Sequence, residues 1–92
     1  MDLLDSQARA EFLASYPDWE LEGETISRTF KLKDFSQAMA FVTQVALLSE
    51  TADHHPDIDI RWNRVKLVLT THHADGLTHK DTDLAAKINS LV

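Results

Sequence analysis

The chain has 92 residues, of which 43% are hydrophobic and 26% are charged, and its formal net charge is −6 at neutral pH. This length predicts a single domain, residues 1–92, with one hydrophobic core. The negative charge disfavours nucleic-acid binding, the absence of cysteine excludes disulfides and thiolate metal sites, and no apolar run reaches the roughly 20 residues of a membrane span.

The first third of the chain predicts a short helix and a hairpin. Its opening residues lack the basic head and apolar middle of a signal peptide, so we expect a cytoplasmic protein. Residues 6–15 predict a helix with Ser6 as its N-cap. Residues 19–22 and 25–32 predict two strands around Gly23, because glycine permits the positive φ of a tight turn.

A long helix is expected next, over residues 35–53. Asp34 is a favourable N-cap, and Pro56 disfavours helical geometry at the residue before it. Phe41 and Leu47 lie outside the main apolar stripe, so the helix is either buried on a wide arc or contributes to a subunit interface. The stripe itself comprises Phe35, Ala38, Met39, Val42, Val45, Ala46 and Leu48 or Ser49.

A second hairpin and a closing helix complete the chain. Residues 58–62 alternate, residues 63–64 predict a turn, and residues 65–72 predict the return strand with His72 on its exposed face. Thr78 predicts the N-cap of the closing helix. The order α-β-β-α-β-β-α indicates an α+β fold, in which a four-stranded antiparallel sheet carries helices on one face.

Histidine is distributed unevenly along the chain. Four of the five histidines fall in two adjacent pairs, His54-His55 and His72-His73. Histidine titrates nearest to neutral pH, so pairs brought together by folding can donate and accept protons. We expect His54, His55 and His72 to converge on one concavity, whereas His73 and His79 are expected to be ordinary surface or structural residues.

Two acidic residues, Glu50 and Asp53, flank the first pair and could orient an imidazole. One protonated and one neutral imidazole are the equipment of general acid-base catalysis. A zinc, iron or manganese site is the competing hypothesis. However, adjacent histidines in an extended chain point to opposite sides, and neither belongs to a His-x-x-x-His spacing. We therefore expect no metal and no other cofactor.

The spacing of these residues is specific. It runs Glu50, three residues, His54-His55-Pro56, five residues, Trp62, nine residues, His72, eight residues, Asp81. This pattern resembles the signature of the pterin-4a-carbinolamine dehydratases, and the similarity extends over roughly residues 19 to 91. The sequence departs from the family at position 62, where tyrosine is common, and at Asp75, where many relatives have glycine.

The resemblance implies a hydro-lyase that converts 4a-hydroxytetrahydropterin to the quinonoid dihydropterin in tetrahydropterin recycling, without a cofactor. By motif position, His54, His55 and His72 would be catalytic: His54 and His72 would transfer protons, and His55 would mainly orient the pterin. The residues expected to bind or shape the substrate site are Glu50, Asp53, Pro56, Trp62, Thr71 and Asp81.

The resemblance also implies homodimers or homotetramers, formed through the long helix of residues 35–53 and the sheet edge. Animal relatives of the family act as dimerisation cofactors for a homeodomain transcription factor, so a protein-binding module is an alternative of another class. A role in molybdopterin metabolism is a further alternative. The sequence does not separate these substrates and partners.

Overall fold

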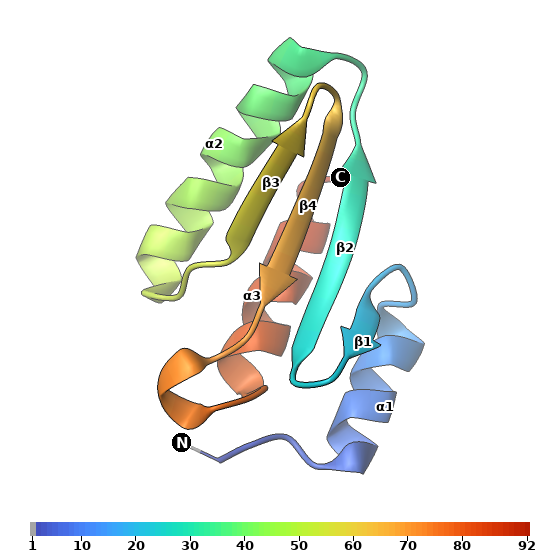
Figure 1. The fold of residues 1–92 in the computed structure, drawn as a ribbon, viewed down its shortest axis with the longest axis vertical. Coiled ribbons are helices and arrows are strands. Elements are labelled where there is room, and N and C mark those ends of the chain that lie inside the picture. Colours follow the sequence, from blue (N-terminus) through green and yellow to red (C-terminus); the bar gives the residue numbers. More distant parts are fainter. Residues whose placement is uncertain (1) are drawn as a thin grey trace.

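The computed structural model describes residues 2–92. Its elements follow one another as helix, hairpin, helix, hairpin and helix, as predicted (Figure 1). None of its helices combines the length and the hydropathy needed to cross a bilayer. The elements are α1 (Ser6–Ser15), β1 (Glu20–Glu22), β2 (Thr25–Lys31), α2 (Phe35–Ala52), β3 (Asp57–Arg61), β4 (Arg64–Leu69), the 3-10 turn η1 (His72–Ala74) and α3 (His79–Asn89).

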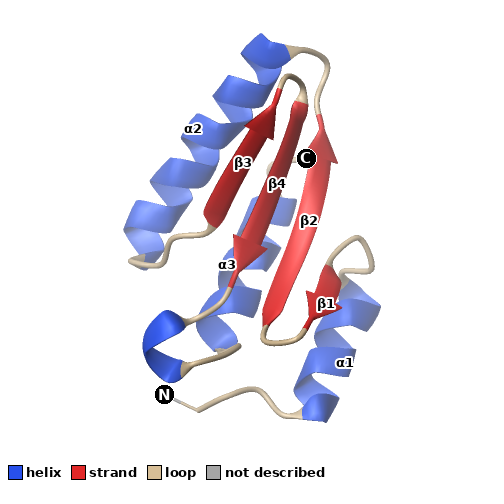
Figure 2. Ribbon diagram, viewed as in Figure 1, coloured by secondary structure: helices blue, strands red, loops and turns tan. Residues whose placement is uncertain are grey.

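The four strands form one antiparallel sheet in the order β1-β2-β4-β3, and the helices lie on one of its faces (Figure 2). This confirms the predicted α+β class. β4 is central, and its alternate side chains Val65, Leu67 and Leu69 are 0% exposed, because they point into the layer between the sheet and the helices. β3 is an edge strand that pairs only with β4.

The helix α2 begins and ends where the sequence predicts. The Asp34 carboxylate caps it by accepting from the Gln37 amide at 2.8 Å. At its other end Asp53 adopts a left-handed conformation (φ 51°), and its amide bonds back to the Glu50 carbonyl at 3.2 Å. This cap turns the chain out of the helix, so the first histidine pair follows directly at the C-terminal mouth.

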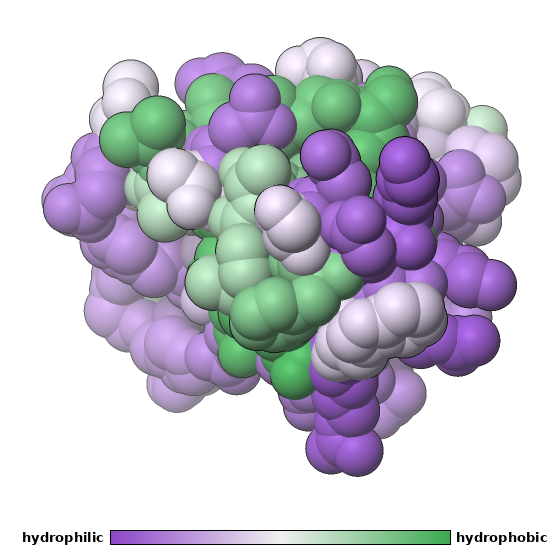
Figure 3. Space-filling view, turned by 90° about the horizontal axis from the view of Figure 1, so that it is seen from above, coloured by the Kyte–Doolittle hydropathy of each residue, from purple (hydrophilic) through white to green (hydrophobic). Residues whose placement is uncertain are grey.

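The buried face of α2 differs from the predicted stripe. Phe41, expected outside it, is only 4% exposed and stacks on Phe30 at 4.7 Å between ring centroids. Phe35 and Met39, expected within the stripe, are instead exposed, and Leu47 is exposed outside it as expected. The buried arc comprises Ala38, Phe41, Val45 and Ser49, so it keeps Ala38, Val45 and Ser49 of the predicted stripe and is rotated toward Phe41. Figure 3 looks onto the end of the molecule where α2 begins, and hydrophobic side chains form a patch there between hydrophilic ones.

Three local expectations were wrong. Asp5, rather than Ser6, caps α1, because its carboxylate accepts from the Ala8 amide at 2.8 Å. The β3–β4 turn comprises residues 62–63 rather than 63–64, since Arg61 still pairs with Arg64. β4 ends at Leu69 instead of His72, because the chain folds back on itself through a backbone bridge between Thr71 and Gly76.

Candidate active site

One hollow of about 210 Å³ collects both histidine pairs. Its walls come from the C-terminal end of α2, the end of β4 and η1, which lie together at the lower left of Figure 1. The lining residues are Asp53, His54, His55, Thr70, His72 and His73. The three histidines expected to converge therefore share a cavity. His73, expected to be an ordinary surface residue, lines the same cavity, and only its adjacency to His72 could have indicated this.

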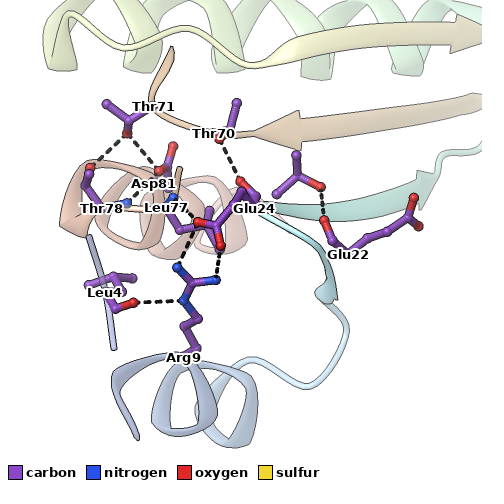
Figure 4. Close-up of polar contacts among 10 residues, drawn as sticks. Leu4, Arg9, Glu22, Glu24, Thr70, Thr71, Leu77, Thr78 and Asp81 are labelled. Carbon is purple, nitrogen blue, oxygen red and sulfur yellow. Dashed lines mark hydrogen bonds and ion pairs between the residues drawn. The ribbon is translucent and has the colours of Figure 1, made fainter. Parts of the chain in front are cut away.

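His54 is the buried member of the group, 8% exposed, and its Nε2 lies 2.5 Å from Asp81 Oδ1. Asp81 is completely buried at the start of α3. Its second oxygen accepts from the Thr71 hydroxyl at 2.8 Å and from the Thr78 amide at 2.9 Å (Figure 4). Because three contacts from different directions hold the Asp81 carboxylate, its orientation is fixed, and this in turn fixes the plane of the His54 ring.

The Asp81 contact also assigns the tautomer of His54. A carboxylate accepts, so Nε2 carries the proton that faces it. Nδ1 of His54 has no hydrogen-bond partner within residues 2–92. Since every fully buried polar side-chain atom in these residues does have a partner, Nδ1 must be in contact with solvent. In the neutral ring this Nδ1 is unprotonated. It is therefore the ring nitrogen of His54 that is free to accept a proton.

His55 is held by a different carboxylate from that of its neighbour. Its Nε2 contacts Glu50 Oε2 in the last turn of α2, and both side chains are largely exposed, 58% and 75% respectively. The two adjacent imidazoles are thus each held by a carboxylate, one in the dry interior and one in water.

His72 and His73 stand exposed on η1. The loop that carries them is closed by paired backbone hydrogen bonds, Thr71 amide to Gly76 carbonyl at 3.1 Å and Gly76 amide to Thr71 carbonyl at 3.3 Å. Asp75 takes the left-handed conformation at its end (φ 59°). This closed turn aims both rings toward the end of α2 instead of continuing the strand.

The remaining expected site residues lie at different places. Thr71 and Asp81 are fully buried and act on the hollow only through their neighbours. Pro56 is half-buried directly after the histidine pair. Trp62 is 66% exposed at the far end of the β3–β4 hairpin, roughly 16 Å along the strand from its start. A single chain therefore does not bring Trp62 to the histidines.

Volume alone does not mark this hollow. A larger one, of about 300 Å³, lies on the open face of the sheet and is lined by Thr29, Asp59, Arg61, Arg64 and Lys66. It contains no histidine, and its acid and base groups are exposed strand residues. No group of three or more histidine or acidic side chains within residues 2–92 is arranged to hold a metal ion. The histidine hollow is distinguished by its convergent, carboxylate-held imidazoles.

Known proteins place the chain in one family. Residues 2–91 match the profile of the family described as Pterin 4 alpha carbinolamine dehydratase. A protein of Chloroflexus aurantiacus, provisionally named pterin-4-alpha-carbinolamine dehydratase, is 58% identical over 92 residues, which is 100% of this chain and 99% of that protein. A similarly named protein of Acidobacterium capsulatum is 52% identical over 92 residues and 100% of both chains.

Solved structures agree with these matches. The crystal structure of a transcriptional coactivator/pterin dehydratase from Brucella melitensis has a TM-score of 0.92 and 39% identity, covering 98% of each chain. A pterin dehydratase-like RuBisCO assembly factor of the alpha-carboxysome has a TM-score of 0.66 at 23% identity, covering 79% of this chain and 84% of that chain, and shows the fold alone. The chain belongs to the pterin 4 alpha carbinolamine dehydratase family.

Proposed function

We propose that this member of the family dehydrates 4a-hydroxytetrahydropterin to the quinonoid dihydropterin by histidine acid-base chemistry. The single observation that carries this is the hollow in which His54, His55 and His72 meet, each with a ring nitrogen or a whole ring open to solvent. The reaction belongs to tetrahydropterin recycling, and we place it in the cytoplasm.

The chemistry asks for two proton transfers. The C4a–O bond breaks, the leaving hydroxyl takes up a proton and departs as water, and a ring nitrogen supplies its electron pair and loses a proton. The pterin loses water and exchanges no electrons with another molecule, so the step needs no redox cofactor. A general acid and a general base within hydrogen-bond reach are sufficient.

The geometry supports a division of roles. His54 presents an unprotonated Nδ1 and is the proton acceptor, because Asp81 holds its other nitrogen as a donor. His72, exposed on η1, is the proton donor to the leaving hydroxyl. His55, held by Glu50, orients the pterin ring, and Asp53 shapes the wall beside it. Pro56, which follows the histidine pair, and the buried Thr71 support this wall from behind.

The test is the double replacement His54→Ala/His72→Ala, assayed by stopped-flow dehydration of synthetic 4a-hydroxytetrahydropterin. We expect the acceleration to disappear while the circular dichroism spectrum stays that of a folded protein. His79→Ala is the matched control, since His79 is an exposed histidine outside this hollow. A double variant that keeps the wild-type rate would reject the proposal. Parallel assays with molybdopterin precursors address the alternative substrate class.

Self-association is the second part of the proposal, as a homodimer or homotetramer. The exposed apolar side chains of α2, Phe35 (51%), Met39 (39%) and Leu47 (65%), form one surface suited to a second copy. The edge strand β3 is the other, because its outer backbone groups are unpaired in the chain and Asp59 and Arg61 can pair with their counterparts across a two-fold axis.

Antiparallel pairing of two β3 edges would also explain the position of Trp62. It would set the hairpin tip of one copy beside the Pro56 end of the other copy's β3, next to that copy's histidine hollow. Mixing Trp62→Ala with His54→Ala/His72→Ala tests this, because a mixed dimer would carry one intact site and regain activity. The pairing of two β3 edges would be contradicted if Trp62→Ala alone were fully active and the mixture of the two variants gave no additional activity.

A protein-binding role is the alternative that the same apolar surface favours, and the Brucella relative is described as a transcriptional coactivator as well as a pterin dehydratase. Size-exclusion chromatography with pull-down separates the two. A dedicated partner would displace self-association through α2, whereas an enzyme without a regulatory role would give only homo-oligomers.

A further inference from the structure

The loop of residues 70–78 carries His72 and His73, and both of its ends are attached to one residue of the β1–β2 turn. The Glu24 carbonyl accepts from the Thr70 hydroxyl at 2.7 Å, and Glu24 Oε1 accepts from the Leu77 amide at 3.3 Å (Figure 4). Glu24 thus brackets the loop on either side of the Thr71–Gly76 bridge.

Glu24 is itself held in place from α1. The guanidinium of Arg9 donates to both carboxylate oxygens, at 3.0 and 2.8 Å, which is the bidentate arrangement that fixes a carboxylate in plane and direction. Arg9 Nε donates to the Leu4 carbonyl at 2.9 Å, and the Leu4 amide donates to the Leu77 carbonyl at 2.8 Å. The contacts close a ring that begins and ends at Leu77.

The electrostatics keep this ring charged. The hydrogen bonds from Arg9 hold the pKa of the Glu24 carboxyl below its ordinary range, with the Leu77 amide contributing in the same direction. The same pair raises the pKa of Arg9. Both groups are therefore ionised at any pH at which imidazoles exchange protons.

Gly76 shows how closely the carboxylate approaches the loop. A Cβ at this position would lie 2.2 Å from Glu24 Oε1 and 3.0 Å from Glu24 Cδ. Any side chain there would displace the carboxylate from its contacts. The glycine is thus required by the close approach, and its backbone φ is not in the left-handed region.

The ring is connected to both proton-transferring histidines. His72 stands on the bracketed loop, and the two threonines at its ends, Thr71 and Thr78, hold the carboxylate of Asp81. We propose that Glu24, clamped by Arg9, is a positioning residue that fixes the loop of residues 70–78 and thereby the placing of His72 in the histidine hollow. The kinetic part of this inference rests on the proposed function.

A purely stabilising ion pair would behave differently from a positioning one. Pterin orientation is assigned to Glu50, at the end of α2, and to His55, which follows that helix. Within residues 2–92, Glu24 forms no hydrogen bond with either residue. Loosening the loop should therefore lower kcat by roughly tenfold or more, because small misplacement of an acid-base group is costly, and change KM by less than about threefold.

The experiment compares Glu24→Ala with Glu22→Ala, a carboxylate at the end of β1, two residues before Glu24, whose side chain forms no hydrogen bond or ion pair within residues 2–92 (Figure 4). Each variant is measured by stopped-flow dehydration and by NMR of the His72 and His73 ring resonances, which needs no substrate. Gly76→Ala displaces the carboxylate while leaving residue 24 intact, so it serves if Glu24→Ala does not fold.

We expect Glu24→Ala and Gly76→Ala to lower kcat and to shift or broaden the ring resonances, with Glu22→Ala matching wild type. The swap Arg9→Glu/Glu24→Arg keeps the charge attraction but can neither accept from the Leu77 amide nor donate to the Leu4 carbonyl, so it should stay impaired. Wild-type behaviour of Glu24→Ala in both measurements, or full recovery by the swap, would overturn the inference. If the wild-type protein does not accelerate dehydration, the proposed function fails. The positioning role of Glu24 is then decided by the His72 and His73 ring resonances alone.

Discussion

Asp81→Asn is the most direct perturbation of the candidate site, because it alters one atom of a fully buried group. The carboxylate accepts three hydrogen bonds, from His54 at 2.5 Å, Thr71 at 2.8 Å and Thr78 at 2.9 Å. An asparagine oxygen can keep the two threonine contacts. Its amide nitrogen then faces His54 Nε2 and donates, so the ring must carry its proton on Nδ1, the nitrogen that is free in the wild-type protein.

The expected magnitudes separate stability from activity. One hydrogen bond to a carboxylate is worth about 1.5–3 kcal/mol, and the inverted tautomer restores part of it, which leaves a loss of about 1–2 kcal/mol. A domain of this size tolerates that loss, at a cost of roughly 4–16 °C in Tm. Positioned acid-base catalysis contributes about 10²–10⁴-fold, so kcat should fall by about 100-fold or more.

The assay is stopped-flow dehydration together with ¹⁵N NMR of the His54 ring and a thermal melt. Ser49→Ala is the control, since it removes a buried hydroxyl hydrogen bond of 2.8 Å from the same end of α2 without touching an imidazole. It should cost at most about 1 kcal/mol and leave kcat unchanged. An Asp81→Asn enzyme with kcat within about threefold of wild type, despite an inverted His54 tautomer, would refute the reasoning.

Three further outcomes are expected. Met39→Glu should shift the protein toward smaller species in analytical ultracentrifugation, because Met39 is exposed on the apolar side of α2, whereas Gln44→Glu should not. Gly23→Ala should destabilise the fold by about 1 kcal/mol in urea melts; its φ is +57° and nothing lies within 4 Å of the added Cβ, so strain alone acts. The pKa of Glu24 is lowered in the folded state by the Arg9 hydrogen bonds, so its stabilisation is fully present above the ordinary carboxyl pKa and is lost as pH falls through the lowered one. The Tm difference between wild type and Glu24→Gln should therefore stay constant at neutral pH and shrink only in acid; a difference that grows in acid would contradict this sign.

The fold was predictable because its signals are local. Alternation in Val65, Leu67 and Leu69 marks a half-buried strand, and Asp34 and Thr78 mark helix starts by side chains that cap the following amides. The errors lie where several local solutions compete. Phe41 was misplaced because α2 is apolar on more than one face, and packing against Phe30 decided which face is buried.

The sequence predicted which residues form the candidate site better than it predicted how they contact one another. The histidine pairs and the spacing to Asp81 are visible in the sequence, but the burial of Asp81 and its contact with His54 depend on α3 reaching the end of α2. Glu24 and Arg9 carried no signal, since single charged residues in a turn and on a helix are usually solvated. The position of Trp62 depends on the turn at residues 62–63, which shifts the tip of the hairpin by one residue from the predicted place.

The two carboxylate–imidazole pairs differ in their access to mobile ions. His55 and Glu50 are open to the solvent, where a Debye length of about 3 Å at 1 M salt is short enough to screen a direct contact, whereas Asp81 and His54 are shielded from it. Raising the ionic strength should therefore weaken ring orientation and increase KM while leaving kcat nearly constant. Under the proposed roles, the dipeptide His54-His55 would place proton transfer on a salt-insensitive support and ring binding on a salt-sensitive one.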